Sequence, residues 1–234
     1  ERVYIPKTIT KIGAGAFSNS GIRELYYDAE EISDFNGNNW IFYPQQEEQF
    51  SSNQMKQNIN LVVGPNVKCI PSRFFLPLGT HLNIHPVVKS VKFAKNSRCE
   101  TIGEYAFYGL ENLQSIHLPD SLKTIGEYAF YNTGLKELYL PDNVESISDN
   151  AFMFSDKVEH LRMPRQLKEI GTNCFYGLAS LKHLSFADTN LNELGEGAFK
   201  NCTSLNYLDL GNIKTINART FENCSALETI YLND

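Results

Sequence analysis

The sequence predicts an α/β repeat solenoid, with a curved parallel β-sheet on the concave face and short helical or 3-10 turns on the convex face. Three observations predict this fold class. The phrase Ile-Gly-Glu-Tyr-Ala-Phe-Tyr occurs twice, starting at Ile102 and at Ile125; a Phe recurs at a nearly fixed interval; and a pattern of alternating apolar residues accompanies each Phe. A fixed period of about 20 to 50 residues is typical of stacked repeats.

The Phe of the repeated phrase measures the period. Successive copies are separated by 23, 22, 23, 24 and 22 residues, at Phe107, Phe130, Phe152, Phe175, Phe199 and Phe221. Upstream, Ile12-Gly13 with Phe17 is another copy, and Ile70 with Phe74-Phe75 is a degenerate one. Between these two copies the period stretches. A unit of about 23 residues has too little interior to fold alone, so we expect the copies to stack around one continuous core.

The first element of each copy is a short strand. Segments such as Leu135-x-x-Leu138-x-Leu140 alternate along the chain, and a period of two indicates a strand with one buried face. We expect ten such strands to pair in parallel into one sheet. The residue between the last two apolar positions points away from the core. This open column is Tyr4, Tyr26, Val62, Lys92, His117, Tyr139, Arg162, Ser185, Asp209 and Tyr231. A second open column is Glu24, Asn60, Ser90, Ser115, Glu137, His160, His183, Tyr207 and Thr229.

The second element of each copy, Ile-Gly-x-x-Ala-Phe, has a different spacing. It predicts a tight turn at the Gly, followed by one helical or 3-10 turn that carries the Ala and the Phe. We expect the Ala to lie where this turn approaches the neighbouring copy closely, and the Phe to fill the convex side of the core. Cys174 stands in the Ala position of its copy, where a free Cys behaves as a small apolar residue.

The whole chain of 234 residues is predicted to be a single solenoid of about ten coils, with irregular insertions near residues 30–60 and 76–90. It starts without Met, directly with a strand-like segment, and we interpret it as a fragment of a longer chain. The first insertion carries Trp40 and Tyr43. These rings are either an exposed binding hot spot, and so a secondary candidate site, or a plug over a widened coil. The plug is favoured because large aromatic side chains are more often buried than displayed.

Composition and motifs argue against several functional classes. The net charge of -6, the pI near 5.4 and the absence of a basic run argue against nucleic acid and anionic membranes as partners. No segment approaches the about 20 consecutive apolar residues of a membrane-spanning helix, so membrane insertion is not expected. No catalytic or phosphate-binding motif occurs, so we predict neither enzymatic activity nor a cofactor. His160 and His183 are predicted neighbours, but spacing places no third ligand beside them, so no metal is expected.

The five cysteines are widely spaced, without a Cys-x-x-Cys pair. Their odd number leaves at least one without a partner in the same chain. Cys202 and Cys224 are predicted neighbours in the stack, but adjacency alone does not set the geometry of a disulfide. Asn201 and Asn223 precede them and match the glycosylation sequon; because both recur at one repeat position, we interpret them as turn residues.

The combined pattern, Leu-x-x-Leu-x-Leu-Pro followed by Ile-Gly-x-x-Ala-Phe and a small residue or Cys, resembles the leucine-rich repeats of BspA-like bacterial surface proteins. The resemblance covers the chain outside the two irregular stretches, and it lacks the Asn column that usually follows the strand in leucine-rich repeats. It implies a leucine-rich repeat fold and a cell-surface or secreted protein, often of host-associated bacteria, that adheres to extracellular matrix or to other cells. That function is inherited by analogy.

A binding role is expected on the concave sheet, because Tyr, His and Arg are enriched at protein interfaces. The predicted ligand site comprises His117, Tyr139, His160, Arg162, His183, Tyr207 and Asp209. The expected partner is a host or matrix protein or a glycan, and the chain is expected to be a monomer. Two alternatives stay open. Tyr also packs well across neighbouring strands without binding anything, and the chain as a whole is alternatively a structural spacer that presents another domain away from the cell surface.

Overall fold

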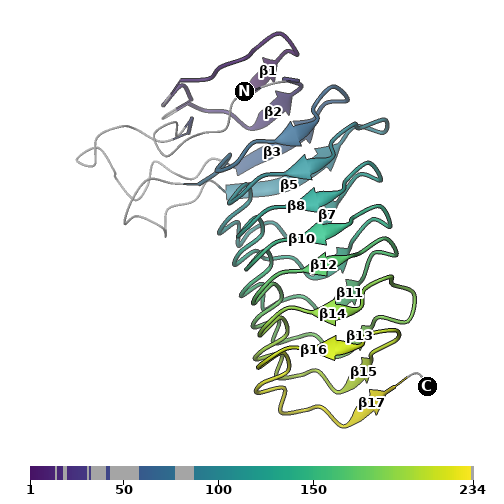
Figure 1. Cartoon of the computed structure of the whole chain (residues 1–234). Helices are drawn as coiled ribbons and strands as arrows, with labels where there is room; N and C mark the ends of the chain where they lie inside the picture. Colours follow the sequence, from purple (N-terminus) through teal and green to yellow (C-terminus); the bar gives the residue numbers. More distant parts are fainter. Residues whose placement is uncertain are drawn as a thin grey trace.

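The computed structural model describes residues 1–13, 15–17, 20–30, 32, 41–42, 58–76 and 87–232. These residues form a solenoid in which the coils follow one another from the N-terminal to the C-terminal end (Figure 1). Most of the two predicted insertions lies outside the described residues. The two aromatic candidates in the first insertion, Trp40 and Tyr43, are among those not described.

The first set of strands runs along one side of the solenoid, which we call the strand face. Ten strands occur there, as predicted: β1 (Arg2–Ile5), β2 (Glu24–Tyr27), β3 (Asn58–Val63), β5 (Val87–Phe93), β7 (Ile116–His117), β9 (Glu137–Tyr139), β11 (His160–Arg162), β13 (His183–Ser185), β15 (Tyr207–Asp209) and β17 (Thr229–Tyr231). All of the pairings between them are parallel. Tyr4 lies opposite Tyr26 and Tyr139 opposite Arg162, so the predicted open columns are confirmed where strands pair.

The prediction of one continuous sheet is wrong. The strands form three parallel sheets, ordered β1-β2-β3-β5-β7, β9-β11 and β13-β15-β17, with interruptions between β7 and β9 and between β11 and β13. The strands that border the interruptions contain only two or three residues. Each therefore offers few backbone hydrogen bonds, and a small displacement between coils is enough to break the pairing.

The Ile-Gly segments form a second set of parallel strands, where the sequence predicted only a turn. These are β4 (Cys69–Ile70), β6 (Thr101–Ile102), β8 (Thr124–Ile125), β10 (Ser146–Ile147), β12 (Glu169–Ile170), β14 (Glu193–Leu194) and β16 (Thr215–Ile216). The first five make one sheet and the last two another. Each strand from β4 to β14 ends with a buried apolar residue, and Thr and Ile are β-branched residues that favour extended backbone. The turn at the Gly follows this strand.

The Ala-Phe segments form turns, and the described residues contain no helix. The Ala106 N–H donates to Gly103 O at 3.3 Å, which closes a turn inside the coil, while the Phe107 N–H donates to Ala129 O of the next coil at 2.8 Å. The expected helical or 3-10 turn is therefore replaced by a ladder of turns bonded from coil to coil. We call this side of the solenoid the turn face.

Left-handed residues explain why these turns do not continue as helices. Two positions in each coil have positive φ, two residues before and two residues after the stacked Phe. The first column is Gly15, Arg73, Tyr105, Tyr128, Asn150, Asn173, Gly197 and Arg219; the second is Gly109, Asn132, Phe154, Gly177, Asn201 and Asn223. Left-handed backbone costs an ordinary residue about 1 to 2 kcal/mol and ends a right-handed turn. The coil-to-coil hydrogen bonds hold these residues in place.

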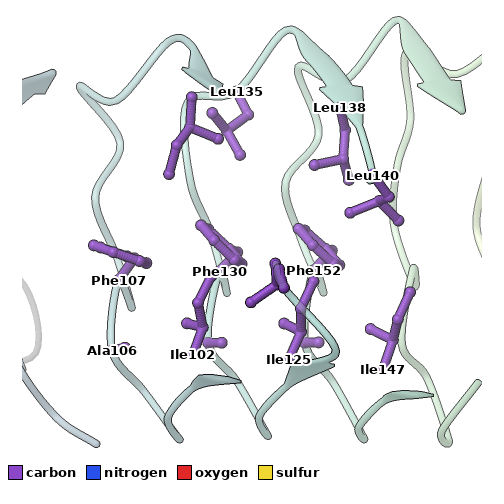
Figure 2. Packing of buried hydrophobic residues seen from close by; sticks show 14 of the residues in the cluster. Ile102, Ala106, Phe107, Ile125, Phe130, Leu135, Leu138, Leu140, Ile147 and Phe152 are labelled. Carbon is purple, nitrogen blue, oxygen red and sulfur yellow. The ribbon is translucent and has the colours of Figure 1, made fainter. Parts of the chain in front are cut away.

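The core is a stack of Phe rings with aliphatic side chains on either side. Consecutive rings from Phe107 to Phe221 have centroids 5.1, 5.0, 5.4, 5.1 and 5.8 Å apart and are within 26° of parallel. Figure 2 shows Phe107, Phe130 and Phe152 between the Ile side chains of the second strand set and the Leu side chains of the strand face. The Ala positions Ala106, Ala129 and Ala151 and the equivalent Cys174 are fully buried, as predicted.

Phe42 occupies the same stack in the stretched N-terminal part of the chain. Its ring lies 6.0 Å from Phe17 and 5.4 Å from Phe75. The Phe17 N–H donates to Ile41 O at 2.6 Å, which is the bond that an Ala carbonyl accepts in the regular coils. Ile41 and Phe42 are both buried. This part of the first insertion therefore completes a coil, while the alternatives for Trp40 and Tyr43 concern residues outside the described part.

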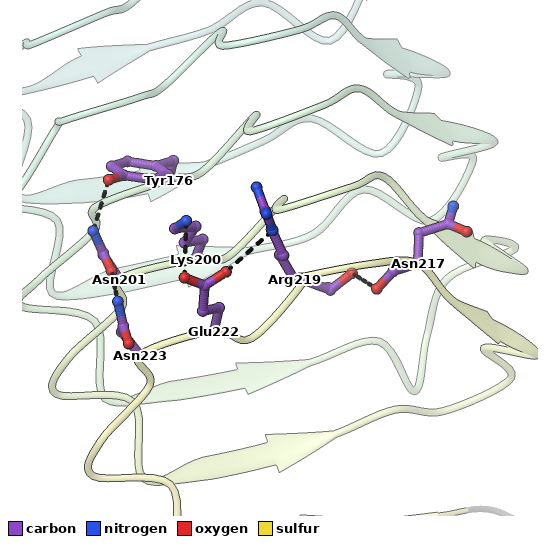
Figure 3. Close-up of polar contacts among 8 residues, drawn as sticks. Tyr176, Lys200, Asn201, Asn217, Arg219, Glu222 and Asn223 are labelled. Carbon is purple, nitrogen blue, oxygen red and sulfur yellow. Dashed lines mark hydrogen bonds and ion pairs between the residues drawn. The ribbon is translucent and has the colours of Figure 1, made fainter.

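Polar ladders on the turn face join the last coils. The Asn201 side-chain amide donates to the Tyr176 hydroxyl at 2.7 Å, and the Asn223 amide donates to Asn201 Oδ1 at 2.8 Å (Figure 3). Lys200 pairs with Glu222 at 3.0 Å. Both sequon Asn residues have left-handed backbone, and the side-chain amide of each donates a hydrogen bond to the preceding coil. This is the turn role that was predicted for them.

Candidate functional site

The candidate site lies on the strand face, where the predicted residues fall into two groups. His117, Tyr139, His160 and Arg162 belong to β7, β9 and β11, whereas His183, Tyr207 and Asp209 belong to β13 and β15. The interruption between β11 and β13 separates the two groups. All seven residues therefore lie on the strand face, on strands that belong to three separate sheets.

A hollow of about 270 Å³ opens where the sheet is interrupted between β7 and β9. Its lining includes His117, Glu137, Tyr139 and Arg162. Tyr139 is 55% exposed, so most of its ring is available to a partner. A second hollow of about 180 Å³ lies at the other interruption, between β11 and β13, and Arg162 lines it as well. Arg162, on the last strand of the first group, thus borders both hollows.

Contacts on one side hold the Arg162 guanidinium in place. Its Nη2 lies 2.6 Å from Asp142 Oδ1, and its Nη1 donates to Leu140 O at 3.3 Å. Arg165 lies 3.8 Å from the other oxygen of Asp142. An Arg guanidinium has five N–H donors, so N–H groups are left for a ligand while the side chain keeps a fixed direction. Asp142 and Glu137 were not among the predicted site residues, although Asp142 follows the Pro that ends the strand.

The side chains of the second group contact other residues of β13, β15 and β17 and the turn that follows β15. The Ser185 hydroxyl donates to Asp209 Oδ2 at 3.1 Å, and the Gly211 N–H donates to Asp209 Oδ1 at 3.0 Å. The Tyr207 ring lies 5.8 Å from His183 and 5.1 Å from Tyr231. Both carboxylate oxygens of Asp209 and both sides of the Tyr207 ring are therefore occupied. This group stabilises the pairing of β13, β15 and β17.

The two predicted neighbours His160 and His183 lie in separate sheets. His160 lies opposite Glu137 in the paired strands β9 and β11, and no ladder joins His160 to His183. Within the described ranges, no three His, Cys, Asp or Glu side chains are grouped so that they could hold a metal ion. The strand-face residues offer a partner hydrogen-bond donors and acceptors, charge and aromatic rings.

Cys99, Cys174, Cys202 and Cys224 are not joined by disulfides in the structure. Cys202 and Cys224 are neighbours in the stack, as predicted, and their thiols donate to Phe175 O at 3.5 Å and to Phe199 O at 3.2 Å. The interaction between the two thiols, together with burial, raises the pKa of Cys202 well above its ordinary value, and the same interaction lowers the pKa of Cys224. The described part of the chain also has no helix with the length and apolar character needed to cross a membrane.

Comparisons with known proteins agree with the repeat architecture. Six copies of a family model described as a BspA type leucine rich repeat region match residues 1–43, 85–189 and 145–234. No curated protein sequence matches the chain. The crystal structure of a leucine rich repeat protein from T. pallidum is similar over 97% of this chain and 77% of its own length, with 20% identity and a TM-score of 0.55.

Two further solved structures have lower scores. A leucine-rich repeat protein from Bacteroides ovatus matches 98% of this chain and 78% of its own length, with 17% identity and a TM-score of 0.37. The pneumococcal vaccine antigen PcpA matches 94% and 66%, with 18% identity and a TM-score of 0.34. Only the first of the three structures therefore supports the fold, and none of them assigns a ligand.

Proposed function

The chain belongs to the BspA-type leucine-rich repeat family, and on that premise we propose that it is a non-enzymatic binding module at the cell surface or in the secreted space. Its ligand is a protein or a glycan that docks on the strand face. Repeat solenoids present long continuous surfaces and typically bind partners through them. The family resemblance to bacterial surface proteins supports the location and an adhesion-type role.

The observation that carries this proposal is the hollow between β7 and β9, with Arg162 on its edge. A hollow lined by His117, Tyr139 and Arg162 combines aromatic contact area with a directed hydrogen-bond donor. Because Asp142 and Leu140 already fix the guanidinium, little side-chain entropy is lost when a ligand binds it. Arg and Tyr are also the residue types that contribute most to binding at protein interfaces.

The first step of the test is a binding screen of the chain against immobilised matrix proteins and glycans. The second step compares the wild type with a Tyr139→Ala, Arg162→Ala double variant against each ligand that binds. We expect the double variant to lose at least about tenfold in affinity, since central Tyr and Arg residues each contribute about 2 kcal/mol or more at interfaces.

Tyr4→Ala is the matched control, because Tyr4 belongs to the same open column, is 61% exposed and lies at the far N-terminal end. Circular dichroism and thermal melting establish that each variant is folded. Wild-type affinity in the double variant would refute the strand-face site. A screen without any ligand would favour the spacer alternative, which requires no specific surface.

A further inference from the structure

A second surface, on the turn face, is built by the two identical copies of the repeated phrase. Tyr105 stacks on Tyr128 at 4.9 Å and 17°, and Tyr108 stacks on Tyr131 at 4.6 Å and 3°. The two stacks lean toward each other, with 5.6 Å between Tyr105 and Tyr108 and 5.8 Å between Tyr128 and Tyr131. Together with Leu76 and Met153 they line a hollow of about 380 Å³, which we call the tyrosine cleft.

The core does not require these four rings. They lie outside the Phe stack, and they are half-buried. Other coils have Asn150 and Asn173 where Tyr105 and Tyr128 lie, with the same left-handed backbone. Tyr in that position carries the cost of left-handed backbone without the compensation that Asn gains from its own side chain.

A groove lined by carboxylates adjoins the tyrosine cleft. Glu104 directly precedes Tyr105 and Glu127 directly precedes Tyr128; with Asp149 of the next coil they line a hollow of about 570 Å³ over β6, β8 and β10. Burial, followed by the carboxylates of Glu104 and Asp149, raises the pKa of Glu127. In the part of the chain that the structure describes, no ion pair involves Glu104 or Glu127. The groove therefore presents carboxylates that form no ion pair in the described chain, with Arg73 as a neighbouring cation over Tyr105.

Arg73 shows that a guanidinium group packs against a ring of the tyrosine cleft. Its guanidinium carbon lies 5.5 Å from the centroid of the Tyr105 ring. A cation over an aromatic face is attracted by the electron density of the ring, and Arg is the side chain that does so most often. The rings and the adjoining carboxylates are thus complementary to one chemistry, that of a positively charged group with a flat or extended shape.

We propose that the tyrosine cleft and the adjoining acidic groove dock a basic segment of a partner protein, with its Arg or Lys side chains against the Tyr rings and their charges beside Glu104 and Glu127. An extended segment fits this surface because rings and carboxylates both recur from one coil to the next. The site is separate from the strand face, so the two surfaces can be occupied independently.

The test uses a fluorescein-labelled peptide in which Arg alternates with Gly, titrated with the intact chain and followed by fluorescence anisotropy. The matched probe is the same peptide with Glu in place of Arg. We expect the Arg peptide to bind, with an affinity that falls as salt rises because exposed charges are screened. The Glu peptide is expected not to bind.

Two variants examine the two parts of the surface. Tyr105→Asn with Tyr128→Asn removes one ring stack and keeps a residue that the protein itself uses at this position, and it should weaken binding by about tenfold. Glu104→Gln with Glu127→Gln keeps the side-chain size and should reduce both the affinity and its salt dependence. Tyr4→Ala, on the other face, should bind as the wild type does.

Three results would overturn the proposal. One is equal binding of the Glu and Arg peptides, and another is wild-type affinity in the folded Tyr105→Asn, Tyr128→Asn variant. The third is binding of a neutral oligosaccharide at the cleft without binding of the Arg peptide, which would assign the Tyr rings to carbohydrate. None of these results bears on the strand face, so the two proposals fail separately.

Discussion

Replacing Phe130 by Ala tests whether the Phe stack stabilises the coils. The side chain is fully buried, and its ring centroid lies 5.1 Å from that of Phe107 and 5.0 Å from that of Phe152. A buried aromatic side chain removes about 150 to 250 Å² from water, which corresponds to about 4 to 6 kcal/mol at about 25 cal/mol per Å². Ala keeps part of this area and the neighbours relax only partially, so we expect a loss of about 3 to 5 kcal/mol in the free energy of unfolding.

Two other positions supply the comparison. Tyr139→Ala removes a ring that is 55% exposed and should lower stability by less than about 1 kcal/mol. Phe221→Ala removes a half-buried ring with one stacked neighbour, Phe199, at 5.8 Å, and its loss should fall between the other two.

Urea unfolding followed by circular dichroism gives the free energies for the wild type and the three variants. The slopes must be compared as well, because a repeat protein can unfold in parts and a changed slope would reveal it. Equal losses for Phe130→Ala and Tyr139→Ala would refute the assignment of inside and outside. A loss at Phe221 as large as that at Phe130 would contradict the argument from stacking.

Three further predictions concern single positions. Gly177→Ala should lower stability by about 1 to 2 kcal/mol, because φ is +76° and the added Cβ would lie 2.9 Å from a ring of the neighbouring coil; Gly13→Ala, with no atom within 4 Å, is the control for the same thermal melt. Glu127→Gln should raise the free energy of unfolding at pH 7 but not below the unfolded-state pKa of Glu. Burial raises the pKa of Glu127 in the folded protein, so the wild type loses stability as pH rises through that folded pKa, whereas Gln does not titrate. Equal differences between variant and wild type at all pH values would contradict this argument. In the folded protein iodoacetamide should label Cys224 before Cys174, whose thiol pKa is raised by burial, and peptide mass spectrometry showing the reverse order would refute the assignment.

The parts of the fold that recur in residue identity could be predicted from the sequence. The Phe column from Phe107 to Phe221 and the alternating strand residues depend on local side-chain periodicity, which the sequence displays directly. The Ile-Gly strands were missed because two residues are too few to show alternation. Phe42 was missed because it lies in the stretched part of the chain, although Ile41-Phe42 follows the spacing of the Ala-Phe pair.

The left-handed columns and the hollows were the hardest features to predict. Asn150 and Asn173 are ordinary left-handed residues and could have signalled the first column, but Tyr105 and Tyr128 at the same position concealed it. The strand-face residues His117, Tyr139 and Arg162 were predicted from their open positions, yet the hollow between them depends on a break in backbone pairing. That break lies between strands of two and three residues, which are too short for their sequence to distinguish paired from unpaired backbone.

The ladders have a mechanical consequence, because backbone hydrogen bonds of the turn face join each regular coil to the next, with added bonds wherever the strands pair. A tensile load applied at the two chain ends therefore acts first on the bonds of an outermost coil, and the inner coils stay closed until it has peeled away. Each coil of 22 to 24 residues then lengthens the chain by about 70 to 85 Å, at about 3.3 to 3.6 Å per residue. Under load the regular coils therefore extend the chain in nearly equal steps. Each step limits the force that the two ends transmit, which a rigid rod would not do.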